Sequence, residues 1–250
     1  MMITLFNGDN HKNIYYADLS IGTMVQANQH LIVHNKVGML LDPGGHKVYT
    51  QLFAKLSQEI PINGLEHLFF SHQDPDVIAA ANGWLMITDA KAYLSGLWAR
   101  FIPHFGVDEL VVRKITPIPD EGMCVDVGGC EIKFIPAHFL HSPGNFQVYD
   151  TVSKILYTGD LGASLGQNYD IVENFEEHIP YMRGFHKRYM PCSDALKMWV
   201  KTVRKLDVQT IAPQHGAMMQ GEMVDQFIDW LEHLECGLEL MGDSFPIPSK

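Results

Sequence analysis

Short runs of apolar and β-branched residues alternate with longer segments of helical period along this chain. Most of the short runs are followed by Gly, Pro, Asn or Asp, which is the pattern expected of strands that end in turns. The predicted strands cover residues 14–17, 29–34, 37–41, 65–70, 91–94, 122–127, 130–135, 146–149, 154–157 and 208–212. Asn35-Lys36 and Gly128-Gly129 are the turns expected between the strands of two hairpins.

The helical segments follow the strands in each half of the chain. They are predicted over residues 46–58, 77–87, 175–206 and 222–240. Pro191-Cys192-Ser193 interrupts the third segment, and Ser193 is the expected N-cap of its second part. Two β-rich halves that each end in helices predict an α/β protein with an αββα four-layer sandwich, in which two sheets face each other and the helices lie outside. We expect residues 1–250 to form one domain.

Charge and composition narrow the classes of partner. The chain has 250 residues and a formal charge of −11, with 46% hydrophobic residues. An acidic protein disfavours nucleic acid and anionic membrane as partners, because both require cationic patches. No apolar run approaches the roughly 20 residues of a membrane span, and the N-terminus lacks the features of a signal peptide. A cytoplasmic protein is therefore expected.

Cysteine and histidine usage points to metal ligands of the imidazole and carboxylate type. The cysteines at 124, 130, 192 and 236 form no CxxC pair, so we expect free thiols rather than a zinc knuckle or a redox dithiol. The chain contains 13 histidines, a high number that favours a search for metal ligands among them.

Six potential ligands follow four of the predicted strands. Each of the four places contains Gly or Pro, where a sharp turn can put a side chain at the end of a sheet. They are His72, Asp74 and Asp76 in Ser71-His72-Gln73-Asp74-Pro75-Asp76, His141 before Ser142-Pro143-Gly144, Asp160 after Gly159, and His215 before Gly216. Three histidines and three aspartates suffice for two metal ions that share one bridging carboxylate. Taken singly, a His at a strand end is more often a hydrogen-bonded structural residue, and an Asp after Gly is usually part of a turn.

The order of these motifs resembles the metallo-β-lactamase superfamily. That superfamily carries His-x-His-x-Asp-His, then a His before a Pro-Gly turn, an Asp after a strand and a late His-Gly. Here position 74 is Asp and position 77 is Val where the hydrolases have His. An acidic residue at the first of these positions resembles the flavodiiron proteins, which use Glu there. A hard carboxylate in place of imidazole also favours iron or manganese over zinc.

Three segments together resemble the oxygen-binding di-iron protein family, a branch associated with oxygen sensing. They are the motif at 71–76, Arg100-Phe101-Ile102-Pro103-His104-Phe105-Gly106 and Phe185-His186-Lys187-Arg188-Tyr189-Met190. The resemblance implies two iron ions with a bridging oxo, hydroxo or peroxo group. It implies that His72, Asp74 and His141 hold the first iron, that Asp76 and His215 hold the second, and that Asp160 bridges them. Without a His at 77, the second iron would keep open positions.

Other residues are candidate neighbours of the metals. His138 competes with His141 as a ligand, but the turn after His141 favours the latter and leaves His138 a supporting role. In the family pattern a His at the position of His104 is near the site. A structural role for His104, in a loop bounded by proline, is the commoner interpretation. Tyr181, Phe185 and Tyr189 share one helical face, which is usually core, and a tyrosine hydroxyl that reaches bound oxygen is the alternative.

The leading functional hypothesis is a non-haem di-iron protein that binds O2 or NO, as a sensor with a signalling partner or as a reductase with an external electron donor. Flavodiiron proteins carry a flavodoxin domain with FMN, and we expect no FMN in this chain because its last segment leaves no room for such a domain. The first rival is a binuclear metallohydrolase of small esters, phosphoesters or thioesters, and the second is a non-catalytic metal-binding module. A homodimer is expected by analogy of fold alone.

Overall fold

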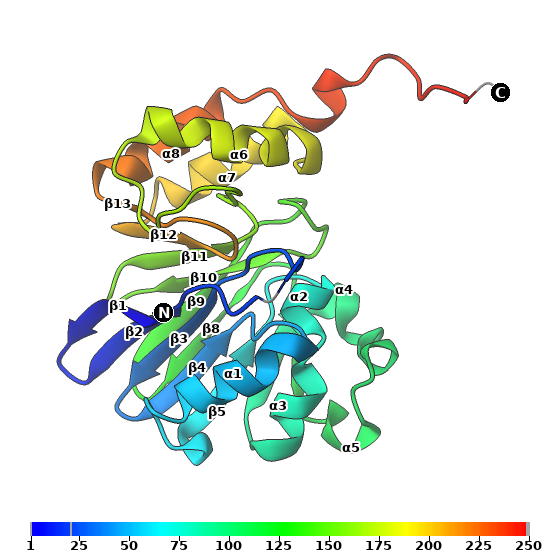
Figure 1. Ribbon diagram of the computed structural model, residues 1–250. Helices are drawn as coiled ribbons and strands as arrows, with labels where there is room; N and C mark the ends of the chain where they lie inside the picture. Colours follow the sequence, from blue (N-terminus) through cyan, green and yellow to red (C-terminus); the bar gives the residue numbers. More distant parts are fainter. Residues whose placement is uncertain (1, 21, 249–250) are drawn as a thin grey trace.

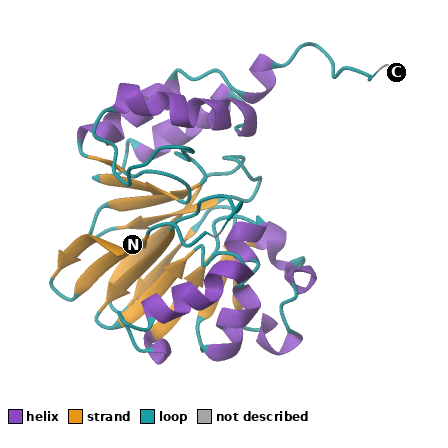
Figure 2. Cartoon of the chain, in the orientation of Figure 1, coloured by secondary structure: helices purple, strands orange, loops and turns teal. Residues whose placement is uncertain are grey.

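Two β-sheets face each other and helices cover both outer sides in the computed structural model, which describes residues 2–20 and 22–248 (Figures 1 and 2). The fold is the αββα sandwich that the sequence predicted. The layers run from the α1–α5 helices through the two sheets to α6, α7 and α8 (Figure 1).

The first sheet contains the seven strands β1 to β7 in chain order. Its first four strands are antiparallel, whereas β4 to β7 run parallel and are joined by helices on the outer face. The strands are β1 Met2–Gly8, β2 His11–Tyr16, β3 Gln29–His34, β4 Val37–Leu41, β5 Leu65–Phe69, β6 Lys91–Ser95 and β7 Ile115–Ile118. Asn35 and Lys36 both have positive φ, at 48° and 71°, as the predicted two-residue hairpin turn requires.

The second sheet has the strand order β13-β12-β11-β10-β9-β8. Only the β11–β12 pair is parallel, and the other neighbours are antiparallel. The strands are β8 Met123–Val127, β9 Cys130–Pro136, β10 Phe146–Asp150, β11 Ile155–Gly159, β12 Thr210–Pro213 and β13 Met219–Gln220.

The helices divide into two outer layers, one for each sheet. The first sheet is covered by α1 His46–Leu56, α2 Pro75–Ile78, α3 Ala81–Ile87, α4 Gly96–Ala99 and α5 Glu109–Val112, with 3-10 turns η1 Ile62–Gly64 and η2 Ile102–Phe105. The second is covered by α6 Phe175–Tyr189, α7 Ser193–Val203 and α8 Glu222–Glu232, with η3 Gly237–Leu240. The chain then extends away from the body toward its C-terminal end (Figure 1).

Three apolar clusters hold these layers together. One lies between the first sheet and its helices and includes Leu52, Leu68 and Trp84. A second, with Phe69 and Phe146, fills the space between the sheets, and the third lies under α6 to α8. Burial of apolar surface on both sides of each sheet explains why the central strands read as continuous apolar runs.

Several predicted boundaries differ from the structure. Strand β1 was not predicted, and neither was β7, an edge strand that tolerates Pro117 because an edge residue needs no ladder donor. The predicted helix 77–87 is two helices, α2 and α3, and the Ala80 N–H between them donates to the Gly44 carbonyl at 3.1 Å. The predicted helix 222–240 ends at Glu232 and is followed by η3. Cys192, not Ser193, is the N-cap of α7.

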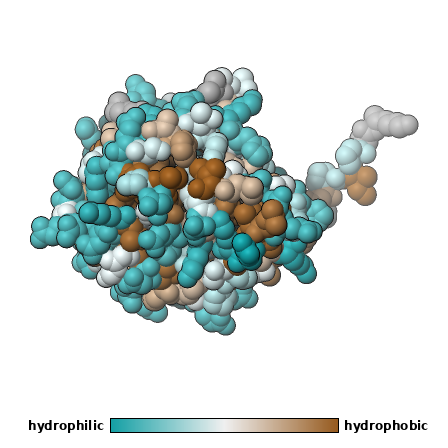
Figure 3. Space-filling model, turned by 90° about the horizontal axis from the view of Figure 1, so that it is seen from below, coloured by the Kyte–Doolittle hydropathy of each residue, from teal (hydrophilic) through white to brown (hydrophobic). Residues whose placement is uncertain are grey.

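The surface of the lower helical layer is mostly hydrophilic, with separate apolar spots among charged residues (Figure 3). Met86 on α3 and Leu110 on α5 are among its exposed apolar side chains. Within residues 2–20 and 22–248, every helix is too short or too polar to cross a bilayer.

Candidate metal centre

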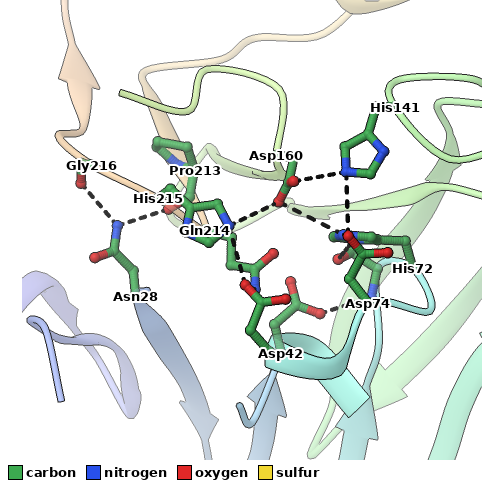
Figure 4. Close-up of polar contacts among 12 residues, drawn as sticks. Asn28, Asp42, His72, Asp74, His141, Asp160, Pro213, Gln214, His215 and Gly216 are labelled. Carbon is green, nitrogen blue, oxygen red and sulfur yellow. Dashed lines mark hydrogen bonds and ion pairs between the residues drawn. The ribbon is translucent and has the colours of Figure 1, made fainter. Parts of the chain in front are cut away.

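The six predicted ligand residues come together at one edge of the sandwich. Figure 4 labels five of them, His72, Asp74, His141, Asp160 and His215. His72, Asp74 and Asp76 follow β5 of the first sheet. Asp160 and His215 follow the parallel strands β11 and β12 of the second, and His141 lies in the β9–β10 loop. Ends of parallel strands meet at the same edge of a sheet, which is why residues so far apart in sequence converge.

Asp160 lies at the centre of the group, and both of its carboxylate oxygens face imidazoles (Figure 4). Its Oδ2 atom is 2.9 Å from His141 Nε2. Its Oδ1 atom is 3.8 Å from His72 Nε2 and 3.4 Å from His215 Nε2. The Asp160 carboxylate therefore faces all three histidines, which is the position expected of a ligand that bridges two metal ions.

Asp74 and Asp76 complete two separate groups on either side of Asp160. Asp74 Oδ2 lies 3.7 Å from His72 Nε2 and 3.6 Å from His141 Nε2. Asp76 Oδ2 lies 3.3 Å from His215 Nε2. Potential ligand atoms of His72, Asp74, His141 and Asp160 all fall within 4.8 Å of one another. Two ions that share Asp160 would thus find three residues on one side and two on the other.

Helix α2 explains the direction of the two aspartates. Asp74 is its N-cap, yet its side chain makes no capping hydrogen bond and faces the histidines instead. Pro75 occupies the first turn, where a missing N–H costs nothing. Val77, at the position where the hydrolases have His, is fully buried in the apolar cluster beneath the first sheet. Asp76 in the first turn is left to face His215.

Polar residues outside the six fix the ligand loops. Asp42, in the turn-like segment Asp42-Pro43-Gly44-Gly45 after β4, accepts a hydrogen bond from the Ser71 N–H at 2.7 Å. The Ser71 hydroxyl lies 2.9 Å from His72 Nδ1. The sequence signal for this contact was an Asp directly after a buried strand. The Pro-Gly-Gly that follows Asp42 is also typical of an ordinary turn, so the signal was ambiguous.

The loop of His215 is held from the first sheet. The fully buried Asn28 donates through Nδ2 to the carbonyls of Pro213 and Gly216, at 2.9 Å each (Figure 4). The Gln26 carbonyl accepts from His215 Nδ1, so the Nε2 atom of His215 is free to face Asp160 and Asp76. A ligand histidine whose other ring nitrogen is fixed by a carbonyl is the usual arrangement in metal sites. Asn28 carries no motif, and the sequence offered no signal for it.

The electrostatics show strong coupling within the group. Burial alone would raise the pKa of Asp160, but His72, His141 and His215 hold that pKa well below its usual range. Burial would likewise lower the pKa values of His72 and His215, but the facing aspartates outweigh it and raise each pKa to about 9. Hydrogen bonding to His72 lowers the pKa of Asp74. Without metal, protons on His72 and His215 therefore offset part of the negative charge of the carboxylates.

The residues fit a metal pair on a structural criterion. Asp160 Oδ1 is buried and accepts no hydrogen bond, although two imidazole nitrogens face it at 3.4 and 3.8 Å. Such spacing exceeds an ordinary hydrogen bond and leaves room between the atoms for a cation. An oxygen-rich set of three carboxylates and three imidazoles suits iron or manganese better than zinc.

A cavity of about 890 Å³ opens onto the group. Asp74, Asp76, His141, Asp160 and His215 line its floor, and its walls include Met24, Ala79, Leu165, Phe185 and Tyr189. The rings of Phe185 and Tyr189 stack at 4.5 Å between centroids and lie 6.2 and 5.6 Å from the His141 ring. The wall is therefore aromatic on the side of His141.

The other predicted neighbours lie in different surroundings. His138 has its Nε2 atom 2.9 Å from the Asp120 carbonyl. His104 is an exposed residue of η2. Tyr181 contacts the rings of Tyr169 and His178. Of the four suggested neighbours, Tyr189 is the one that lines the cavity, and Phe185 joins it there.

Comparison with known proteins agrees with this geometry. The family model described as ODP family beta lactamase matches residues 25–216. A solved chemotaxis sensor ODP, in a peroxy diiron form, is 42% identical, with a TM-score of 0.87 over 96% of this chain and 97% of that one. A variant of a flavo di-iron protein from Thermotoga maritima is 17% identical and shares the fold, with a TM-score of 0.78 over 93% of this chain and 60% of that one.

A curated relative, the uncharacterized protein MJ0732 of Methanocaldococcus jannaschii, is 23% identical over 212 residues. The aligned region is 80% of this chain and 51% of that protein, so the chain spans about half the length of this relative. The match of the family model covers most of the chain and includes Asp160 and the five residues grouped with it. This protein therefore belongs to the ODP family of the β-lactamase fold.

Proposed function

We propose that this protein holds two iron ions at the Asp160 group and binds O2 there as an oxygen sensor. One observation carries the proposal: the six residues converge on a shared carboxylate in a chain that is 42% identical, over nearly its full length, to a chemotaxis sensor ODP with a diiron species. Asp74 supports the choice of metal, because a carboxylate in place of imidazole favours iron over zinc.

In this proposal His72, Asp74 and His141 hold the first iron, Asp76 and His215 hold the second, and Asp160 bridges the two. Val77 is buried in the apolar cluster and supplies no ligand to the second ion. The second ion then has fewer protein ligands than the first, and it faces the cavity through Asp76 and His215. The open side of the site is thus on the second iron.

Bound ferrous ions would supply the electrons for reversible or irreversible capture of O2. The protein contributes position and surroundings. Asn28 and Asp42 fix the ligand loops, while Phe185 and Tyr189 form an aromatic wall of the cavity. A hydrophobic shell around a metal site limits the access of water and lowers the local dielectric constant.

NO would fit the same open position, and the same centre could reduce either gas with an external electron donor. We place the sensor role first because the relative that is 42% identical is a chemotaxis sensor. A sensor needs a downstream signalling partner, whereas a reductase needs a protein that donates electrons. The proposal includes the partner that each role requires, and it places the protein in the cytoplasm as a homodimer.

Iron loading tests the proposal. Metal-free protein, given ferrous iron without air, should bind about two irons per chain and change its visible spectrum when air is admitted. The variant Asp160→Asn should lose both properties, because the shared charge is gone, whereas the exposed Asp225→Asn on α8 removes the same charge elsewhere and should keep them. Colourless, zinc-loaded protein that hydrolyses phosphodiesters would instead support the hydrolase.

A further inference from the structure

A second group of potential ligands lies at the other end of the sandwich. His11 at the start of β2 and His34 at the end of β3 belong to the first sheet, and Cys130 at the start of β9 belongs to the second. Potential ligand atoms of these three residues fall within 4.8 Å of one another. The strand β10 separates the two groups, since Phe146 at its start bonds to Ser71 whereas Asp150 at its end contacts His11.

The two histidines are arranged as metal ligands commonly are. Their Nδ1 atoms lie 3.0 Å apart, which is close to the roughly 3.3 Å between two nitrogens of a tetrahedral zinc site. His11 Nε2 lies 2.7 Å from Asp150 Oδ2, and Asn13 donates to the same oxygen at 2.7 Å. A carboxylate that fixes the far nitrogen of a histidine directs the near nitrogen to the metal.

The third ligand and the charge balance come from the second sheet. Cys130 is buried, and its Sγ atom lies 3.9 Å from Asp150 Oδ1. A thiol binds a metal ion as the thiolate, so Cys130 would release its proton when a cation binds. One thiolate and one buried carboxylate would then neutralise a divalent ion. Without metal, the short contact between the ring nitrogens is a hydrogen bond in which one histidine donates.

One member of the group, His11, borders a surface groove. A groove of about 740 Å³ is lined by His11 with Asn10, Lys12, Val33 and Asn35. His34 is half-buried beside it. The Asn35 side chain donates to the Gly128 carbonyl at 2.8 Å, which fastens the β3–β4 turn to the β8–β9 turn. An ion entering here would find ligands from two sheets that already touch.

We propose that His11, His34 and Cys130 bind a divalent cation of the zinc class, with Asp150 supporting His11, independently of the Asp160 centre. Two imidazoles and a thiolate suit zinc, whereas the oxygen-rich Asp160 group suits iron. Because the ligands come from both sheets, the ion would join the sheets at the end opposite to the iron centre. Water would take the fourth position on the side of the groove.

Cobalt(II) distinguishes the two sites, since a cobalt–thiolate bond gives a strong near-ultraviolet absorption and the Asp160 group contains no cysteine. Titration of the metal-free full chain with Co²⁺ should produce this band, and excess Zn²⁺ should remove it. The band should disappear in Cys130→Ser. It should remain in Cys124→Ser, which alters an exposed thiol on the neighbouring strand β8, and in Asp160→Asn.

Absence of the band, its survival in Cys130→Ser, or its loss in Asp160→Asn would overturn the proposal. Should Cys130→Ser fail to fold by circular dichroism, His34→Gln replaces it, because His34 is half-buried and lies at a strand end. This variant keeps the thiol and should weaken Co²⁺ binding by at least about tenfold. Unchanged affinity in His34→Gln would also contradict the site.

Discussion

At the scale of single residues, the centre depends on charges that are balanced around Asp160. Its two oxygens face His72, His141 and His215, and one of them has no hydrogen-bond partner. Asp74 stands where the hydrolases of this fold have His, and it faces two of those histidines. The identity of residue 74 therefore bears directly on which metal the site prefers.

Replacement of Asp74 by His should shift the metal preference toward zinc. An imidazole in place of a carboxylate removes a hard oxygen ligand and one negative charge, which weakens iron binding more than zinc binding. Competitive loading with equal ferrous iron and zinc, followed by elemental analysis, measures the ratio. Asp225→His, on the exposed face of α8, is the control and should leave the ratio unchanged. An iron-to-zinc ratio that Asp74→His does not lower would count against the assigned role.

Metal affinity should rise with pH. In the metal-free protein, burial would lower the pKa values of His72 and His215, but the surrounding aspartates raise both pKa values to about 9. An ion binds neutral imidazole, so it must displace these protons at any pH below about 9. Apparent affinity should thus fall roughly tenfold per displaced proton for each unit by which pH drops. Iron titrations at several pH values, with proton release recorded, check this, and an affinity independent of pH would refute it.

At the scale of elements, helices and loops set the position of each ligand. Helix α2 begins directly at the centre, and α6 is joined to the Asp160 loop by the buried His186. His186 accepts a hydrogen bond from the Gly162 N–H at 3.0 Å and has its Nδ1 atom 2.8 Å from the Met182 carbonyl. His186 thus links the helix that carries Phe185 and Tyr189 to the loop after β11.

Substitution His186→Leu should destabilise the fold. The buried Gly162 N–H would lose its partner, which costs about 1–3 kcal/mol in the free energy of unfolding. Lys187→Ala, at the next and exposed position of α6, is the matched control and should change stability by no more than about 0.5 kcal/mol. Urea unfolding of the metal-free proteins measures both, and equal stability of the two variants would show that the contact is unimportant.

Much of this centre was predictable because its signals are local. An apolar run followed by His or Asp near Gly or Pro marks a candidate metal ligand at a strand end, and residues 74 and 77 could be compared with a family pattern by position. Supporting contacts were not predictable in the same way. Asn28 reaches the carbonyls around His215 from 185 residues away in sequence, and Asp42 resembled an ordinary turn residue.

Edge strands and helix ends were the other failures, because there local propensity competes with long-range pairing. Strand β7 contains a proline, and the short break between α2 and α3 depends on a contact with Gly44. The group of His11, His34 and Cys130 was missed for the same reason. Its members lie in separate strands of two sheets, and only the packing of the sheets brings them together.

At the scale of the whole molecule, the sandwich presents two chemically different edges. One edge gathers histidines and aspartates in a cavity with apolar walls, and the opposite end gathers histidines and a cysteine between the sheets. The rigid sheets hold each group in place from several strands at once. This division favours oxygen-loving iron at the first edge and leaves the second to a softer ion.

The central claim is that the Asp160 centre, once loaded with ferrous iron, captures O2. Its most direct test is a titration of the anaerobic, iron-loaded protein with O2, followed by visible absorption. We predict a change that saturates near one O2 for every two irons and that Asp160→Asn abolishes. An unchanged spectrum in protein that demonstrably contains both irons would contradict the account.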